Sequence, residues 1–311
     1  PDAEVIDGLK KHPQATRTVL HERADELEQE AGKLRTLAGW VHTMKIQEQL
    51  LLELGKGEEE IDLFYCALLL SKNDDPDLDI AAYRKMLDTM AEEMHERFPS
   101  EAGNLLRLEV LNEYLFKDNG FHGSRGIAYY SQNNSYANRV LDDREGQHIT
   151  LSVVYLELAR RIGIKGLSGA GLAGAFMVHY QAEGRDSGQL IDMYENGSRL
   201  SAAATRIRLG FEEHEPATKR QIVALILRDL IKGIPEQAES GDKIARYYEL
   251  VVEVEPEAED DRVRRARARW QNGNIDGAEK DLIWLLEHDS PRVNKRRIRD
   301  LLQDIKQLNR E

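Results

Sequence analysis

An apolar residue recurs at every seventh position near the start of the chain. The larger members of this stripe are Leu20, Leu27, Leu34 and Val41, and the smaller ones between them are Ala24, Ala31 and Ala38. This spacing predicts a long helix with a narrow, alanine-rich face that packs closely against another helix. Because the pattern lasts about three heptads, we expect the partner to be a helix of the same domain. A homodimer through this N-terminal helix is the alternative.

Helical periodicity predicts further helices before residue 163. They cover residues 61–70, 80–97, 104–116 and 150–162. The segment 117–145 is rich in Gly, Asn, Ser and Tyr, which is typical of loops. Short stretches with β-branched or aromatic residues and bordering glycines then predict strands. The strands are residues 164–170, 174–180 and 189–194, with residues 183–188 as the hairpin loop between the last two.

A repeat is visible in the helical pattern of the C-terminal segment. The pairs that carry it are Ala245 with Ala278 and Pro256 with Pro291. Each pair is separated by about 34 residues, the period of tetratricopeptide repeats. The phrase from Gly273 to Ala278 is similar to the turn of such a repeat. The residues expected to pack are Trp270, Leu282 and Leu286. We therefore predict two tetratricopeptide-like repeats followed by a terminal helix.

Net charge and cysteine content exclude several classes of protein. The formal charge of −13 argues against general binding to nucleic acid or to an anionic membrane. The single cysteine, Cys66, cannot form an intramolecular disulfide, and its apolar neighbours indicate a core residue. The apolar run Leu63–Leu70 is too short to cross a bilayer, and residues 1–11 lack the apolar segment of a signal peptide. We expect a cytoplasmic protein without membrane contact.

The segment from Arg144 to Ile164 resembles the transglutaminase-like superfamily. A glycine turn at Gly146 precedes a buried helix that closes with the family's Ala-Arg-x-x-Gly-Ile signature, here residues 159–164. The chain is most similar to the bacterial SirB-type branch of that family. That branch has helices before its core and a tetratricopeptide tail after it. A polar motif before the core helix also matches, and we expect its residues to bind a ligand: Asn134, Ser135, Tyr136 and Asn138.

The resemblance implies a fold and a division of the chain. The fold is α+β and predominantly helical, with a transglutaminase-like (papain-like) core that contains a small antiparallel sheet. The expected segments are an N-terminal helical segment at 1–57, the transglutaminase-like domain with its leading helices at 58–210, and the tetratricopeptide-like domain at 211–311.

Two of the family's three catalytic residues are missing. The family uses a Cys at the start of the core helix, a His on a strand and an Asp on the next strand. Alignment on the end of the helix places His148 at about the Cys position, and Ala175 stands where the His is expected. Asp192 matches the third member. The resemblance therefore implies a non-catalytic scaffold without cofactor or metal, which binds a protein or peptide through its helical tail or the remnant cleft.

A hydrolase that uses no thiol is the alternative function. His148 and Asp192 could form a pair, and Ser152 lies four residues after His148 on the same helix face. However, hydroxyls inside helices commonly bond to the carbonyl one turn earlier. A metal site formed by His148, Asp192 and His179 is a weaker option, since no close ligand spacing supports it.

Two arginine-rich runs lie in the tail, at residues 262–269 and 295–299. We expect a solvated surface there, balanced by the acidic stretch from Glu255 to Asp261. Docking of an acidic peptide or of nucleic-acid phosphates is the functional alternative. Because no known nucleic-acid motif accompanies these runs, we favour the peptide over nucleic acid.

Overall fold

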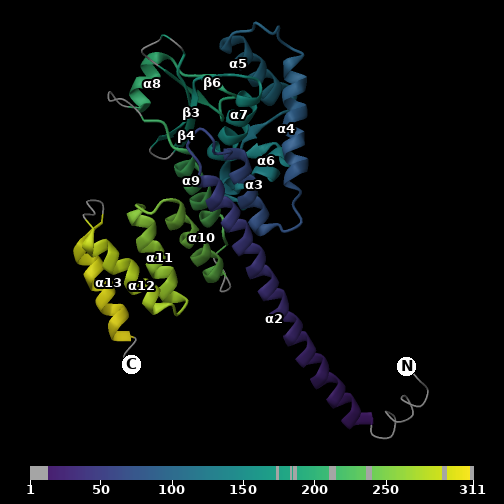
Figure 1. Cartoon of the computed structure of the whole chain (residues 1–311), viewed down its shortest axis with the longest axis vertical. Helices are drawn as coiled ribbons and strands as arrows, with labels where there is room; N and C mark the ends of the chain where they lie inside the picture. Colours follow the sequence, from purple (N-terminus) through teal and green to yellow (C-terminus); the bar gives the residue numbers. More distant parts are fainter. Residues whose placement is uncertain are drawn as a thin grey trace. The chain divides into compact units, whose positions relative to one another are not determined.

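The computed structural model describes residues 13–172, 175–182, 184, 188–209, 215–235, 240–288 and 293–308. The chain divides into two compact units, Pro1–Glu48 and Gln49–Glu311. The described part of the first unit is one helix, α2 (Pro13–Leu54), which continues into the second unit. The heptad stripe therefore lies on a single uninterrupted helix, as its spacing predicts (Figure 1).

The second unit is mainly helical, and its helices begin where the sequence supplies caps. Asp62 accepts a hydrogen bond from the backbone of Tyr65, and Asp79 accepts two from the first turn of the next helix. The helices that precede the sheet are α3 (Leu63–Asp74), α4 (Ile80–His95), α5 (Asn104–Asn112), α6 (Ala137–Asp143) and α7 (His148–Arg161). Helix α7 is buried along most of its length and contacts the other four. It is the core helix predicted from the sequence, and His148 is its first residue.

A four-stranded antiparallel sheet follows α7. Its strands, in spatial order, are β3 (Leu167–Leu172), β4 (Ala175–Tyr180), β5 (Gln189–Asp192) and β6 (Ser198–Arg199). The first strand starts later than the predicted residue 164, because the Ile164 amide still bonds to the carbonyl of Ala159 and closes α7. Gly166, with a φ of 77°, then turns the chain into β3. Residue 174 and residues 183 and 185–187 of the predicted hairpin loop lie outside the described residues.

The segment predicted as loop contains short elements. They are a π-helical turn η1 (Glu113–Asp118), 3₁₀ turns η2 (Gly126–Tyr130) and η3 (Gln132–Ser135), helix α6, and two strands, β1 (His122–Gly123) and β2 (Glu145–Gly146). Strands β1 and β2 pair in parallel, His122 with Glu145 and Gly123 with Gly146. This pairing fixes the polypeptide just before α7. Elements this short carry no periodicity that a sequence reading could detect.

The remaining helices follow the sheet in chain order. They are α8 (Ala202–Leu209), α9 (Lys219–Lys232), α10 (Ser240–Val254), α11 (Glu259–Gln271), α12 (Ile275–Glu287) and α13 (Lys295–Leu308). Helix α9 starts at a capping box formed by Thr218 and Gln221, and it contacts α3, α7 and η3. Helices α10 to α13 then pack each on the next. None of the described helices is long and apolar enough to span a membrane.

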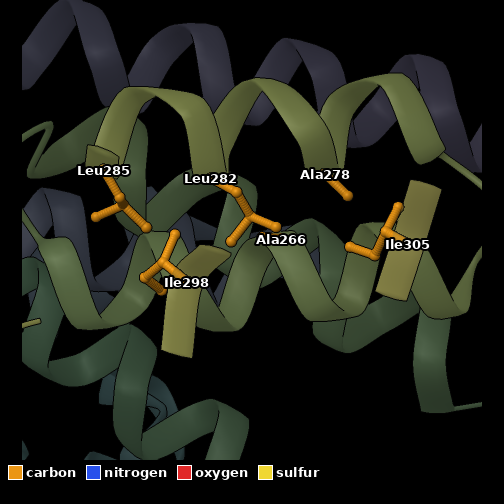
Figure 2. Close-up of a cluster of buried hydrophobic side chains, with 6 residues drawn as sticks. All are labelled: Ala266, Ala278, Leu282, Leu285, Ile298 and Ile305. Carbon is orange, nitrogen blue, oxygen red and sulfur yellow. The ribbon is translucent and has the colours of Figure 1, made fainter. Parts of the chain in front are cut away.

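A separate apolar cluster holds the last three helices together. Figure 2 shows its buried members: Ala266, Ala278, Leu282, Leu285, Ile298 and Ile305. The two alanines let α11 and α12 approach closely. Trp270 and Leu286 pack against the cluster from its rim, so the three residues predicted to pack here do so, with Leu282 at the centre. Pro291 lies outside the described residues.

The arginine run of α11 is only in part the solvated surface expected from its sequence, since Arg264 and Arg267 are exposed but the other three arginines are not. Arg262 and Arg265 are only 9% and 8% exposed. Together with Arg269 they surround the carboxylate of Asp281 in α12, which is 2% exposed and lies 2.9 Å from both Arg265 Nε and Arg269 Nη1. For these three arginines the expectation was wrong, because their neutralising carboxylate, Asp281, comes from the next helix and not from the acidic residues before the run, whereas Arg264 lies 3.4 Å from Asp261 as that stretch predicts.

Candidate functional site

The start of α7 is held in place by backbone contacts. Gln147, the residue before the helix, is extended and fully buried. Its amide donates to the carbonyl of Asn134 at 3.0 Å, and its side-chain Nε2 donates to the carbonyl of Tyr129 at 2.8 Å. A side chain at Gly146 would meet Val140 and Leu151. The glycine turn and the polar motif therefore position the residue that follows, His148.

His148 is half-buried and lies beside two aromatic rings, those of Tyr129 and Tyr194. Its imidazole stacks on the ring of Tyr194, with 3.5 Å between centroids and 10° between planes. The hydroxyl of Tyr129 lies 3.3 Å from Nδ1 of His148. A side chain at Gly123 would overlap the Tyr194 ring, so the glycine of β1 makes room for it. The sequence reading missed Gly123, Tyr129 and Tyr194, because nothing in their local pattern links them to His148.

Burial decides the protonation state of these rings. It lowers the pKa of His148 below the ordinary 6.5, while the charges of Asp192 and Asp229 oppose that shift in part. Burial also raises the pKa of Tyr129 and of Tyr194 above the ordinary value. At neutral pH the site therefore holds a neutral imidazole between two protonated phenols. Asp229, on α9, is a second charged neighbour that the sequence did not reveal.

Asp192 and Ser152 are engaged elsewhere. The Asp192 carboxylate accepts a hydrogen bond from the Tyr194 amide at 2.9 Å and so shapes the turn after β5. The hydroxyl of Ser152 donates to the carbonyl of His148 at 2.7 Å, the backward bond expected of a helical serine. Within the described part of the chain, neither Asp192 nor Ser152 is hydrogen bonded to the His148 ring.

Ala175 is the first residue of β4 and pairs with Leu172. The register of β4 and β5 joins Val178 to Ile191, so Met177 stands opposite Asp192 and Ala175 lies two residues further along the same face. A methyl group can neither accept nor donate a proton. Cys66 offers no thiol in its place, because it is fully buried in α3 and burial raises the pKa of its thiol.

The polar motif before α7 lies inside the protein. Asn134 donates to the hydroxyl of Ser124 at 2.8 Å, and the Tyr136 hydroxyl donates to Asp74 of α3. Four buried oxygens near the start of α7 lack a hydrogen-bond partner among the described residues: Ser135 Oγ, Asn138 Oδ1, Gln147 Oε1 and Thr150 Oγ1. The contacts of Asn134 and Tyr136 are structural. A binding role for Asn134, Ser135, Tyr136 and Asn138 stays a prediction.

No cluster of three or more His, Cys, Asp or Glu side chains suitable for a metal occurs among the described residues. His179, the third ligand considered from the sequence, lies on β4 opposite Leu190, with its ring next to Gly188. The candidate site is therefore the aromatic cluster of Tyr129, His148 and Tyr194, whose imidazole is influenced by the charges of Asp192 and Asp229.

A family model of the transglutaminase-like superfamily matches residues 81–228, from α4 into α9. A UPF0162 protein of Xylella fastidiosa strain 9a5c is 31% identical over 262 residues, which cover 77% of this chain and 90% of that protein. The chain belongs to the UPF0162 family. A second UPF0162 protein, from strain Temecula1, is 32% identical over 257 residues, which cover 76% of this chain and 88% of its own. The match confirms a transglutaminase-like domain within a predominantly helical α+β fold.

Among solved structures, the crystal structure of menin that reveals its binding site for Mixed Lineage Leukemia protein is similar at a TM-score of 0.38. The two chains are 9% identical, and the alignment covers 79% of this chain and 69% of menin.

Proposed function

We propose that this protein is a non-catalytic, SirB-type member of the transglutaminase-like superfamily that serves as a binding scaffold. The observation that supports this most strongly is the environment of His148. A ring stacked on Tyr194 occupies the helix start where the family's mechanism needs a thiol. Ala175 supplies no base opposite it, so the proton transfers of acyl transfer have no partner.

The hydrolase alternative needs a hydroxyl that His148 can deprotonate. The Ser152 hydroxyl donates to a backbone carbonyl, and Asp192 orients the Tyr194 amide instead of the imidazole. These contacts favour the scaffold over the hydrolase.

Turnover assays separate the two functions. Purified wild-type protein and the variant Asp192→Asn are each incubated with peptide amides, thioesters and amine acceptors. The scaffold predicts background rates for both proteins. Saturable turnover that Asp192→Asn and His148→Ala abolish would establish the hydrolase instead.

The ligand surface that we propose is a cavity of about 770 Å³ between α9, α10 and α11. Stacked helix pairs of tetratricopeptide type, which we propose for the tail, form grooves that bind peptides. The carboxyl-bearing residues of the lining are Glu255, Glu257, Glu259, Asp260 and Asp261, and the arginines are Arg220, Arg228 and Arg264. Acidic groups outnumber basic ones, so the cavity favours a peptide with lysine or arginine side chains.

The pairing within the cavity leaves one carboxylate oxygen unsatisfied. Arg228 binds Glu255 and Asp261 at 2.6 and 2.7 Å, and Arg264 lies 3.4 Å from Asp261. Glu259 Oε2 is buried and has no hydrogen-bond partner among the described residues. A buried, unpaired carboxylate oxygen is unfavourable, and the negative charge of Glu259 adds to that of Glu257 and Asp260, which also line the cavity and are exposed to an incoming lysine ammonium.

Fluorescence anisotropy with labelled octalysine tests this ligand class, with octaglutamate as the counter-probe. We expect saturable binding of octalysine that weakens about tenfold when Glu259→Gln and Asp260→Asn remove two charges. The matched control, Asp276→Asn with Glu287→Gln, removes two exposed charges outside the cavity. If both double variants lose the same affinity for octalysine, the effect comes from net charge alone, and this result would contradict the cavity as the binding site.

A further inference from the structure

Helix α2 carries an apolar seam with nothing packed on it within its own unit. The described part of that unit is this helix alone. The larger seam residues are strongly exposed: Leu20 56%, Leu27 49%, Leu34 63% and Val41 64%. Apolar residues at both a and d positions are the pattern of a coiled coil, here with leucine or valine at d and alanine at a.

The seam is not the face by which α2 joins the core of the second unit. Near its C-terminal end, α2 buries Leu50 and Leu54 almost completely. Nine residues separate Val41 from Leu50, which at 3.6 residues per turn is about 180° around the helix. The core-facing side and the seam therefore lie on opposite sides of α2, and the seam needs a partner of its own.

Charges beside the seam identify that partner. With Leu20 at position d, the g positions hold Arg23 and Glu30, and the e positions hold Glu28 and Arg35. In a parallel dimer each g residue faces the e residue five positions later in the other helix. Arg23 then faces Glu28, and Glu30 faces Arg35, which gives four opposite-charge pairs over the two symmetric sides. We propose that α2 forms a parallel, in-register coiled coil with α2 of a second copy of this chain.

An antiparallel pair fits less well. When Ala31 of one helix lies opposite Leu34 of the other, each residue at an e position faces an e position of the partner helix, and each residue at a g position faces a g position. Glu28 still meets Arg35, but Glu30 and Arg23 meet Leu37 and Met44, so only two opposite-charge pairs remain. In the single chain, Arg23 pairs with Glu26 at 2.7 Å, and both side chains are more than 60% exposed. This exposed pair is weak and leaves Arg23 available to the second helix.

The coiled coil is short, and alanines fill half of its seam. Two apolar g residues, Leu37 and Met44, are 56% and 68% exposed and widen the contact toward the C-terminal end. We therefore expect a dimer with a dissociation constant on the order of micromolar. The inference concerns α2 alone and does not depend on the proposed function of the second unit.

Light scattering coupled to size exclusion tests the dimer with the full chain. We expect twice the mass of one chain at high concentration, and a monomer for Leu27→Asp with Leu34→Asp. The control, Val19→Asp with Trp40→Asp, places the same charges on the outer c positions, which are 61% and 59% exposed, and it should remain dimeric. Circular dichroism verifies that each variant is folded. A wild-type monomer at concentrations well above micromolar would overturn the proposal.

Charge reversal and cross-linking test the orientation. The double variant Glu28→Arg with Arg35→Glu makes all four charge pairs of the parallel dimer repulsive, so we expect a monomer. The same variant keeps the charge pairs of an antiparallel dimer attractive, so an antiparallel dimer would persist. Adding Arg23→Glu and Glu30→Arg should restore the dimer. Leu27→Cys should form a disulfide between copies under oxidation, because only a parallel, in-register pair brings residue 27 to its own equivalent. A dimer that survives the first reversal and does not cross-link at residue 27 would refute the parallel arrangement.

Discussion

At the scale of single residues, Asp281 joins α12 to α11 through a buried network of ion pairs. Its carboxylate accepts hydrogen bonds from Arg265 and Arg269 and lies 3.4 Å from Arg262. Arg262 also lies over the ring of Trp284, 3.8 Å from its centroid. Removing one partner of such a buried network leaves charges that water cannot reach.

We therefore expect Asp281→Asn to lower the free energy of unfolding by about 3–5 kcal/mol, measured by urea denaturation. Glu249→Gln is the matched control, since Glu249 binds Arg269 at 2.5 Å from a position that is 35% exposed. Solvent screening limits that loss to about 1 kcal/mol. Similar losses in the two variants would contradict the role assigned to Asp281.

His148 should make stability depend on pH. Burial lowers its pKa below 6.5 in the folded state, so below pH 6.5 the unfolded chain binds more protons than the folded one. Stability is then complete above pH 6.5 and decreases as the pH falls from 6.5 toward the folded pKa. We expect His148→Phe, which retains an aromatic ring, to lose this component.

Urea unfolding of wild type and His148→Phe at pH 7.5 and 5.5 measures the difference, and nuclear magnetic resonance titration reports the His148 pKa directly. A His148 resonance that titrates at or above pH 6.5 would refute the burial argument.

At the scale of elements, Asp74 connects the core to the tail. It lies at the end of α3 and accepts from Tyr136, from Tyr247 of α10 at 2.7 Å, and from Lys243 at 2.7 Å. Burial alone would raise the pKa of Asp74, but these three donors outweigh it and the pKa lies below the usual 3.8. The polar motif thus has a structural task, which is to join η3, α3 and α10.

We predict that Asp74→Asn lowers the free energy of unfolding by about 2 kcal/mol at neutral pH. Because the folded pKa is depressed, the stability from Asp74 is present above pH 3.8 and is lost as the pH falls through the folded pKa. Asp77→Asn, an exposed neighbour, is the control. Denaturation at pH 7 and pH 3 tests both statements, and a loss that persists unchanged at pH 3 would contradict them.

The longer elements could be predicted from sequence because each carries its own periodicity. Helices α3, α4 and α7 and strands β4 and β5 begin close to their predicted residues. The two-residue strands could not be found because they depend on pairing between distant segments, and the 3₁₀ turns and α6 are too short to show a period. Residues of the candidate site that come together only through the fold could likewise not be predicted from the sequence. Asp192 and His148 were identified by a family resemblance, whereas Tyr194 and Asp229 reach His148 through the fold alone.

At the scale of the whole molecule, a transglutaminase-like domain is combined with a site that, in the function we propose, lacks the residues for acyl transfer. The core helix, the sheet and the Asp192 position remain. A stacked imidazole and a methyl group stand where a thiol and a base would be required. We therefore interpret the protein as a scaffold that binds a peptide without altering it.

Mass spectrometry of a bound peptide tests this account most directly. The protein is incubated with octalysine at saturating concentration. The peptide is then recovered, and its mass is compared with that of peptide kept in buffer. The account predicts saturable binding and an unchanged peptide mass, with no adduct on the protein. Cleaved peptide, a mass shift of transamidation or an acyl adduct, absent with His148→Ala, would contradict it.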